Sequence, residues 1–465
     1  MHQKKQFNRY VPILIKQRLD ELDYTRKDNL YTIIDLINRK EIYFKSDLQR
    51  NYGYSEICLA QFKELLPTSN YLNEDLNFLI DEGLIMRNEY FTWGYKSKAY
   101  KIPSEYLGKA IGVKIQNENI NKRIAKQIEK YKRIKVKSLE FAKSQYFKNF
   151  KVDIEGAHKA ILEKAINEIS DLCVSLNFPL HKIHIKEIIE CSPNSKKTRH
   201  FITEQKDGKE LLNILHRYMV YTTRINAIND GFLFFKRNKT NGRLDTNLTS
   251  LPSFLRQFII SDEPLMNIDI KNSQPYFLYV LLKNKSELEQ SELEKYKELT
   301  VSGELYDFLK VEFNRIYKKD WTREQMKIML FKIFYSKTTS FFIYKQFFSQ
   351  YFPTIMEYIS NTNTKQHNTL AVQLQTIESF TVLDIIMPLL GANGIRPYTI
   401  HDSFVCKQSE SDNIMETINN KFVELYGVAP SMHKDYISLI DDDDDDLITD
   451  FEEFLRELNS LDTDS

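Results

Sequence analysis

Apolar side chains in the first hundred residues recur at the spacing of an α-helix in three separate segments. Residues 30–37 carry leucine and isoleucine on one helical face, and a second, shorter helix is expected to begin at Leu48. Residues 72–80 repeat the pattern and are followed by Gly83, a residue suited to the left-handed conformation that ends many helices. Three helices are therefore predicted before residue 84.

Residues 84–102 change to a pattern typical of β-strands, with two runs on either side of a turn centred on Gly94. Three helices followed by a hairpin predict a winged helix over residues 26–103, a fold that often places its third helix in the DNA major groove. That helix carries Glu74 and Asp75, which do not favour contact with phosphate. DNA binding and a protein-docking or structural role both stay open for this domain.

Charge is distributed unevenly along the chain, although the formal net charge is only +1. Residues 109–151 contain thirteen Lys and Arg against three Glu, and residues 114–150 are helix-prone, without proline or glycine. Such a helix either is a solvated face or contacts nucleic-acid phosphates. Residues 435–465 contain thirteen Asp and Glu against one Arg. This acidic tail is either a solvated end or a mimic of nucleic acid that lies on the basic region.

Cysteine spacing and the length of apolar runs indicate the cellular compartment in which the protein is expected. The four cysteines lie far apart, which argues against a disulfide framework or a zinc knuckle and suits a reducing cytoplasm. No run of eighteen apolar residues occurs, and the charged N-terminus is not followed by the apolar segment of a secretory signal. A cytoplasmic globular protein with two to four domains is expected from the 465 residues.

Two aspartates lie at the ends of segments that are typical of β-strands. Asp269 lies between two isoleucines, where a carboxylate is costly to bury unless it binds a cation. A plainer interpretation is that Asp269 caps the helix predicted near Pro275. Asp402 follows His401 between two β-prone runs and is expected at the tip of a hairpin. Two such carboxylates suit Mg²⁺, a hard cation that takes oxygen ligands.

A third segment, residues 321–337, has basic and aromatic residues at helical spacing. Arg323, Lys327, Phe331 and Tyr335 recur every four residues and would form one stripe along a helix. Two cations followed by two aromatic residues are not typical of a core-facing stripe, because a core stripe does not begin with Arg and Lys.

A fourth segment, residues 239–259, combines a turn with basic residues. Gly242 before Arg243 lets the backbone turn tightly and directs a guanidinium group toward duplex phosphates. Leu251 and Pro252 follow, and then Arg256. A glycine next to an arginine is common, so this segment gains meaning only from its place beside the other three.

In their order and spacing these four segments resemble the family A, DNA polymerase I-like DNA polymerases. Residues 302–309 and 351–359 also resemble family stretches, so that the resemblance covers roughly half of the chain. It implies an α+β right-hand polymerase with an antiparallel palm sheet and helical fingers and thumb, preceded by the winged helix. The expected ranges are a winged helix at 1–105, a basic helical thumb at 106–235, palm at 236–285, fingers at 286–370, further palm at 371–435 and an acidic tail at 436–465.

The resemblance also implies roles for individual residues. Asp269, Asp402 and the backbone carbonyl of Ile270 would hold two Mg²⁺ ions. The two cations of the stripe would grip the incoming triphosphate, with Lys327 acting in catalysis, while the two aromatic residues stack on the base. The side chains expected at the DNA primer-template are Arg243, Arg256, Gln375 and His401.

Two departures from the family concern the choice of sugar. The family has a Glu five residues after the first palm aspartate, where it excludes a ribose 2′-hydroxyl; here the counterpart is Gln274, or Tyr276 if the pairing is shifted by two residues. The third palm element has Ser403 after Asp402, as in single-subunit phage RNA polymerases. A DNA polymerase that uses dNTPs is expected. The alternatives are an RNA polymerase or primase that uses rNTPs and an inactive DNA-binding replication protein.

The same resemblance carries an expectation about biological setting. No proofreading exonuclease domain fits into the chain before the palm, and a small polymerase of this kind suits a phage, plasmid or mobile element. A replication-protein partner would then dock through the winged helix or the acidic tail.

Overall fold

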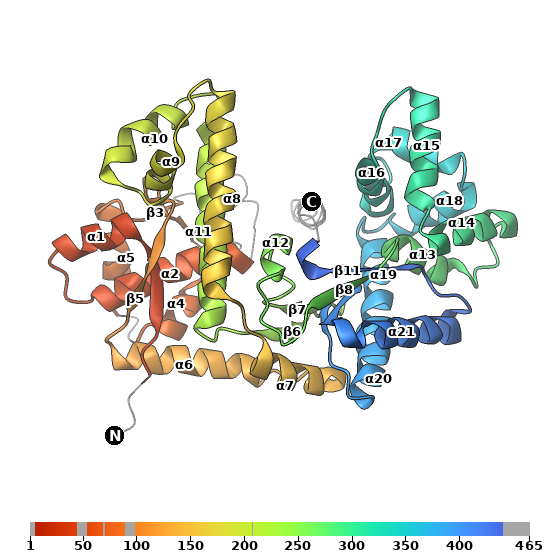
Figure 1. Ribbon diagram of the computed structural model, residues 1–465, viewed down its shortest axis with the longest axis horizontal. Coiled ribbons are helices and arrows are strands. Elements are labelled where there is room, and N and C mark those ends of the chain that lie inside the picture. Colours follow the sequence, from red (N-terminus) through yellow and green to blue (C-terminus); the bar gives the residue numbers. More distant parts are fainter. Residues whose placement is uncertain (1–4, 44–53, 68–69, 89–97, 207, 440–465) are drawn as a thin grey trace. The chain divides into compact units, whose positions relative to one another are not determined.

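The computed structural model describes residues 5–43, 54–67, 70–88, 98–206 and 208–439 (Figure 1). The chain divides into two compact units, one of residues 1–133 with 151–233 and one of residues 134–150 with 234–465. Each unit combines many helices with small antiparallel sheets. The described chain is therefore an α+β protein.

In the first unit, the strand β1 (Asn8–Pro12) pairs antiparallel with β5 (Ala110–Lys114). Between them follow α1 (Ile13–Glu21), α2 (Lys27–Tyr43), β2 (Ser55–Glu56), α4 (Leu59–Leu65), α5 (Leu72–Asp81), β3 (Met86–Arg87), β4 (Ala99–Lys101) and a 3-10 turn (Ser104–Tyr106). After β5 come α6 (Glu118–Lys132), α8 (Ile154–Ser175), α9 (Lys182–Ile189), a 3-10 turn (Pro193–Ser195), α10 (Lys196–Thr203) and α11 (Gly208–Asn229). The two long helices α8 and α11 pack side by side (Figure 1).

Two of the three helices predicted from apolar spacing are confirmed. The apolar face of residues 30–37 is fully buried in α2. The helix α5 ends just before Gly83, which adopts a φ of 68°. The helix expected at Leu48 and the tip of the predicted hairpin lie outside the described residues. The strands that are described form a three-stranded antiparallel sheet in the order β2-β4-β3.

Charged side chains in the first unit form a buried cluster between β1, α2 and the end of α11. Arg9 Nη1 and Arg39 Nε donate to the same oxygen of Asp35 at 2.7 and 2.8 Å. The Arg39 guanidinium lies 4.4 Å from the ring centroid of Phe232, and its Nη2 lies 3.9 Å from Asp230 Oδ2. Since an unpaired buried charge is strongly destabilising, these contacts hold the first strand against the helices.

The carboxyl group of Asp230 should make the stability of this unit depend on pH. Burial raises the pKa of Asp230 from 3.8 to about 6, an effect that the positive charge of Arg39 only partly opposes. The folded state then binds more protons than the unfolded state in this range, so stability falls as pH rises from 3.8 to about 6. In the Asp230→Asn variant this loss should disappear.

We expect Asp230→Asn to match the wild type near pH 4 and to be more stable at pH 7.5. A pKa shift corresponds to about 1.4 kcal/mol per unit, and screening by solvent should reduce the gain to roughly 1 kcal/mol. Thermal unfolding at both pH values, followed by circular dichroism, measures the difference. The same pH dependence in both proteins would exclude Asp230 as its source.

The second unit contains a four-stranded antiparallel sheet in the order β11-β8-β10-β9. Its strands are β8 (Leu265–Ile270), β9 (Tyr398–Ile400), β10 (Ser403–Lys407) and β11 (Met432–Tyr436). The helix α21 (Ser411–Tyr426) contacts β8, and its Phe422 packs against Phe277 of α13 (Ser273–Leu282) with ring centroids 6.1 Å apart. The sheet thus has one face toward helices, and the more exposed residues of β8 and β11, among them Asn267, Asp269 and His433, share the other face.

A helical region follows α13 and is held by an aromatic core that includes Phe313, Phe347, Phe348 and Phe352. Its helices are α14 (Gln290–Ser302), α15 (Leu305–Tyr317), α16 (Arg323–Tyr335), α17 (Phe342–Ser349) and α18 (Pro353–Thr362). Phe313 and Phe347 meet edge to face with ring centroids 5.1 Å apart. The elements of this unit between residues 234 and 264 are β6 (Phe235–Arg237), β7 (Leu244–Thr246) and α12 (Ser253–Arg256).

One long helical stretch runs from Thr369 to Ala392. It consists of α19 (Thr369–Ser379), a π-helical segment (Phe380–Ile386) and α20 (Met387–Ala392). Among the described helices it alone is long and apolar enough to cross a membrane by length and composition. More than half of its most apolar window is buried inside the protein, as is usual for a core helix.

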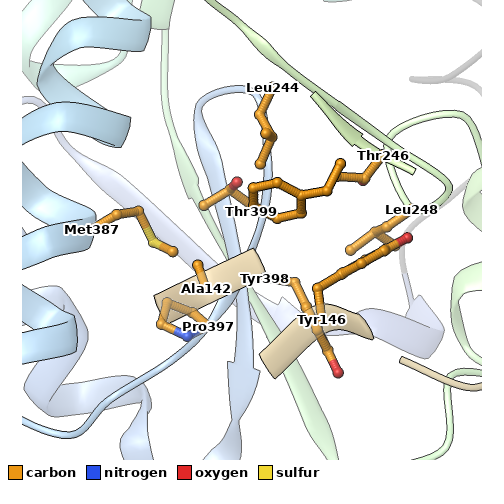
Figure 2. A pocket seen from close by; sticks show the side chains of 10 residues that line it. Ala142, Tyr146, Leu244, Thr246, Leu248, Met387, Pro397, Tyr398 and Thr399 are labelled. Carbon is orange, nitrogen blue, oxygen red and sulfur yellow. The ribbon is translucent and has the colours of Figure 1, made fainter. Parts of the chain in front are cut away.

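The basic segment after β5 forms two helices, and the second of these belongs to the second unit. The two are α6 and α7 (Glu140–Asn149), separated by residues 133–139. Tyr146 of α7 stacks on Phe150 at 4.6 Å and meets the ring of Tyr398 of β9 edge-on at 6.0 Å. Figure 2 shows the apolar pocket around this contact, whose free volume of about 10 Å³ has room for one water at most. Residues 134–150 therefore pack with the sheet unit and apart from the rest of 106–235.

Candidate active site

The sheet brings the two sequence-predicted aspartates to the same end of neighbouring strands. The strands β9 and β10 form a hairpin whose two-residue turn is His401 and Asp402, as predicted, with His401 at a φ of 55°. Asp269 of β8 lies directly opposite Ser403, the residue after Asp402. Because facing residues in an antiparallel pair are close neighbours, the two carboxylates share one edge of the sheet. Both are partly exposed.

Asp269 has another neighbour that the sequence did not reveal. His433 of β11 pairs with Asp269 on the side opposite to Ser403, so both side chains lie on the same face of the sheet. The His433 ring also contacts the carboxylate of Asp435 two residues further along β11. Nothing in the spacing of β11 relates it to Asp269, since more than 160 residues separate the two strands.

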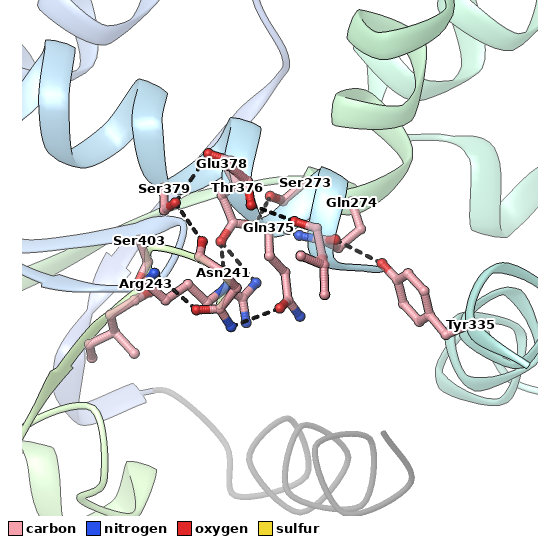
Figure 3. A network of polar contacts seen from close by, with 12 residues as sticks. Asn241, Arg243, Ser273, Gln274, Tyr335, Gln375, Thr376, Glu378, Ser379 and Ser403 are labelled. Carbon is pink, nitrogen blue, oxygen red and sulfur yellow. Dashed lines mark hydrogen bonds and ion pairs between the residues drawn. The ribbon is translucent and has the colours of Figure 1, made fainter. Parts of the chain in front are cut away.

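A buried carboxylate, Glu378 of α19, joins several of the predicted residues (Figure 3). Its exposed fraction is 0%. Arg243 donates to Oε1 through Nε at 2.9 Å and approaches the same oxygen with Nη2 at 2.8 Å. On the other oxygen, Oε2 accepts from Ser273 Oγ at 3.2 Å and from the amide nitrogen of Gln274. Burial raises the pKa of Glu378 to about 7, the negative charge of Asp402 adds to this, and Arg243 opposes it.

The hydrogen-bond network continues from Gln274 to α16. Tyr335, at the C-terminal end of α16, is fully buried, and its hydroxyl donates to Gln274 Oε1 at 2.7 Å. The ring of Tyr335 stacks on Phe331 one turn earlier, with ring centroids 5.9 Å apart. Of the two sugar-facing candidates, Gln274 is thus the one beside Tyr335 (Figure 3).

Tyr276 lies in a different environment. Its side chain is fully buried, its hydroxyl donates to the backbone carbonyl of Val428 at 2.7 Å, and its ring packs near Phe422 at 5.5 Å. Two residues along a helix correspond to a rotation of about 200°, so Gln274 and Tyr276 face nearly opposite sides of α13. The structure therefore places Tyr276 in the core beneath the sheet.

The predicted stripe lies on α16, which begins after a capping box formed by Thr322 and Gln325. Exposure falls along the stripe. Arg323 is partly exposed; it donates to Asp307 at 3.3 Å and lies 5.1 Å from the ring of Tyr306. Lys327 is also partly exposed, whereas the two aromatic residues are buried. The cations are thus accessible to an anionic ligand at the start of the helix.

The remaining predicted residues gather around the turn before β7. Gly242 has a φ of 72°, and a Cβ there would lie 2.6 Å from Ser379 Oγ, so the turn needs glycine to pack on α19. Asn241 donates to Gln375 Oε1 at 2.9 Å, and Arg256 is buried and donates to the carbonyl of Leu251 at 3.0 Å. The structure therefore brings residues 241–243 against the helix that carries Gln375.

His401 should be neutral at physiological pH. Its pKa is held well below the usual 6.5 by burial and by the positive charges of Arg243 and Arg256. The imidazole can therefore both donate and accept a hydrogen bond. The predicted site residues lie on β8, α13, α16, α19, the β9–β10 turn and the segment from residue 243 to α12, and of these Tyr276 has its side chain in the core.

Comparison with known proteins gives limited similarity. No protein-family model matches the sequence, and no curated protein matches it. Among solved structures, the fold is similar to the POL domain of Pol1 from M. smegmatis, in a complex with DNA primer-template and dNTP. That similarity has a TM-score of 0.45 and 11% sequence identity, and it covers 69% of this chain and 72% of the other.

Proposed function

We propose that the second unit is the catalytic core of a template-directed DNA polymerase of the family A type, which extends a primer with dNTPs by nucleotidyl transfer. One observation carries the proposal. Asp269 and Asp402 lie at one edge of an antiparallel sheet, and Gln274, at the start of the helix that follows β8, accepts a hydrogen bond from Tyr335 of the helix that presents Arg323 and Lys327. Carboxylates for metal and cations for phosphate are the two requirements of phosphoryl transfer.

The residues present suit Mg²⁺. Asp269, Asp402 and the backbone carbonyl of Ile270 offer only oxygen atoms, the donors that Mg²⁺ prefers. In the described part of the chain, no group of three or more Asp, Glu, His or Cys side chains could hold a metal. The aspartate pair would thus supply part of a shell, which fits an ion that keeps water and binds substrate phosphates. When bound, two such ions activate a primer 3′-hydroxyl and stabilise the leaving pyrophosphate.

The side chains of this protein would bind and orient the nucleotide and the primer-template. Lys327 and Arg323 neutralise the triphosphate and hold it in line with the primer terminus. Phe331 and Tyr335 provide aromatic surface beside the base of the incoming nucleotide. At the primer-template, His401 offers a neutral imidazole, while Arg243 is held in place by Glu378.

The first unit would serve the same reaction. The order of α2, α4 and α5 with the sheet β2-β4-β3 supports a winged helix at residues 26–103, and the basic helix α6 would follow the phosphates of the duplex as part of the thumb. We propose DNA contact for α6, since its Lys and Arg are mostly exposed or half-buried. A replication-protein partner through the winged helix or the acidic tail is a further part of this proposal.

Primer extension tests the function directly. A labelled primer-template is incubated with Mg²⁺ and the full chain, with dNTPs and rNTPs offered separately. A primer that ends in a dideoxynucleotide serves as the control, since it lacks the attacking hydroxyl. Extension with dNTPs is the expected result. Extension with rNTPs alone would indicate an RNA polymerase or primase, and binding of the duplex without extension would indicate a replication protein without catalysis.

The side chain of Gln274 should take part in the choice of sugar. Replacing it with alanine removes the group that lies between Tyr335 and Glu378 and opens space where a 2′-hydroxyl would lie. We expect Gln274→Ala to lower the preference for dNTP over the matching rNTP by about tenfold, the size of one hydrogen bond or steric contact. Single-nucleotide incorporation gives kcat/KM for each substrate. Tyr276→Phe is the control, because its hydroxyl bonds elsewhere, and it should keep the wild-type preference.

A further inference from the structure

We propose that Glu378 is the positioning residue for sugar selection: it fixes the side-chain amide of Gln274 in one orientation and so makes Gln274 a rigid gate. This inference rests on the proposed polymerase function and deepens it. Glu378 comes from α19, more than a hundred residues from the palm aspartate Asp269, and the sequence pattern gave no reason to single it out.

The orientation follows from hydrogen-bond chemistry. Above pH 7, where Glu378 is ionised, its carboxylate can only accept, so the group of Gln274 that faces Oε2 is the amide nitrogen. The carbonyl oxygen of Gln274 then faces Tyr335, whose hydroxyl donates to it at 2.7 Å. Turning the amide over would place its oxygen against the carboxylate and lose that hydrogen bond. Glu378 therefore determines which face of Gln274 is an acceptor.

The carboxylate itself is held on both of its oxygens. Arg243 occupies Oε1 with two nitrogen atoms, at 2.9 and 2.8 Å, and Ser273 donates to Oε2 at 3.2 Å. The next residue of α19, Ser379, donates to the carbonyl of Asn241 at 2.8 Å and fixes the turn that carries Arg243. Charge-assisted hydrogen bonds of this kind are short and strongly directional, so the carboxylate has little freedom to move.

A fixed amide discriminates better than a mobile one. With both ends of its amide engaged, Gln274 is held in one orientation, and its side chain cannot swing aside to make room for a ribose 2′-hydroxyl. If the amide were released from Glu378, it could rotate, accept the 2′-hydroxyl as a hydrogen-bond partner and tolerate rNTPs. Glu378 thus acts through Gln274 and need not touch the nucleotide.

The test compares Glu378→Gln with a matched control, Glu292→Gln. Glu292 is also a buried glutamate with several partners: it accepts from the backbone nitrogens of Thr354 and Ile355 at 3.0 and 2.8 Å, at the start of α18. Both substitutions neutralise a buried carboxylate, so a merely structural effect should appear in both. We expect Glu378→Gln to lower the dNTP:rNTP ratio of kcat/KM by about tenfold, mainly through better use of rNTPs, and Glu292→Gln to leave the ratio unchanged.

A double mutant tests whether Glu378 acts through Gln274. In the Gln274→Ala background, Glu378→Gln should change the ratio no further, because the group that it positions is gone. Additive effects of the two substitutions on the dNTP:rNTP ratio would overturn the proposal. So would a Glu378→Gln ratio within twofold of the wild type, if Gln274→Ala does change the ratio. If Glu378→Gln does not fold, Glu378→Asp keeps the charge for Arg243 but withdraws it from Gln274, and it should lower the ratio as well. A wild type that extends no primer with either substrate would instead refute the proposed function.

Discussion

Asp402→Asn is expected to abolish primer extension, with a fall in rate on the order of 10³-fold or more. The substitution keeps the size of the side chain and removes its negative charge. Since Asp402 and Asp269 are the pair of carboxylates at this edge of the sheet, the loss of one would leave too little charge to hold two divalent cations against phosphate repulsion. Asp269→Asn should give a loss of similar size.

The matched control for both variants is Asp262→Asn. Asp262 precedes the other end of β8, where it is exposed and pairs with Lys407 at 2.8 Å. Neutralising it should leave extension close to wild type, because a surface ion pair contributes little to stability. Initial rates on the same labelled primer-template, with circular dichroism to verify folding, measure all three variants. If Asp402→Asn retained a tenth of the wild-type rate, the aspartate pair would not be the metal site.

Lys327→Met is expected to lower kcat/KM for dNTPs on the order of 10²-fold. The methionine keeps much of the side-chain length and apolar packing but cannot neutralise charge on the triphosphate. Because phosphoryl transfer relies on electrostatic stabilisation of the transition state, both a higher KM and a lower kcat are expected. Steady-state single-nucleotide incorporation at varied dNTP concentration separates the two parameters.

Lys332→Met on the same helix is the control. Lys332 is half-buried and lies 5.3 Å from the ring of Phe341, on a different face of α16 from the Arg323–Tyr335 stripe. Its loss should change kcat/KM by only a few-fold. Equal effects of the two substitutions would mean that general positive charge on α16, and not the position of Lys327, is what the reaction needs.

Local periodicity was sufficient to predict several elements of the second unit. The stripe on α16 repeats every four residues, and a helix is the regular structure that aligns such residues. The hairpin at His401 and Asp402 was visible because β-branched and aromatic runs flank a two-residue interval. In both cases the information lies within some fifteen residues of sequence.

The links between these segments could not be predicted in the same way. Glu378 lies in an apolar helix. It belongs to the candidate site only because Arg243, 135 residues earlier in the sequence, donates a hydrogen bond to it. The choice between Gln274 and Tyr276 depended on the residue at which α13 begins, since two residues reverse the direction of a helical side chain. The break between α6 and α7 likewise depends on side chains, because Lys143 donates back to the carbonyl of Ile134 at 2.6 Å.

The pairing of β1 with β5 limits how the N-terminal region can be exchanged between proteins. Residues 26–103 look like a portable domain, but β1 precedes them, β5 follows them, and the two strands pair with each other. Arg9 of β1 also neutralises Asp35 inside the candidate winged helix. A fragment cut at residue 26 would expose the edge of β5 and leave Asp35 with Arg39 alone. Recombination that moves residues 26–103 would therefore have to carry at least residues 8–114 with them.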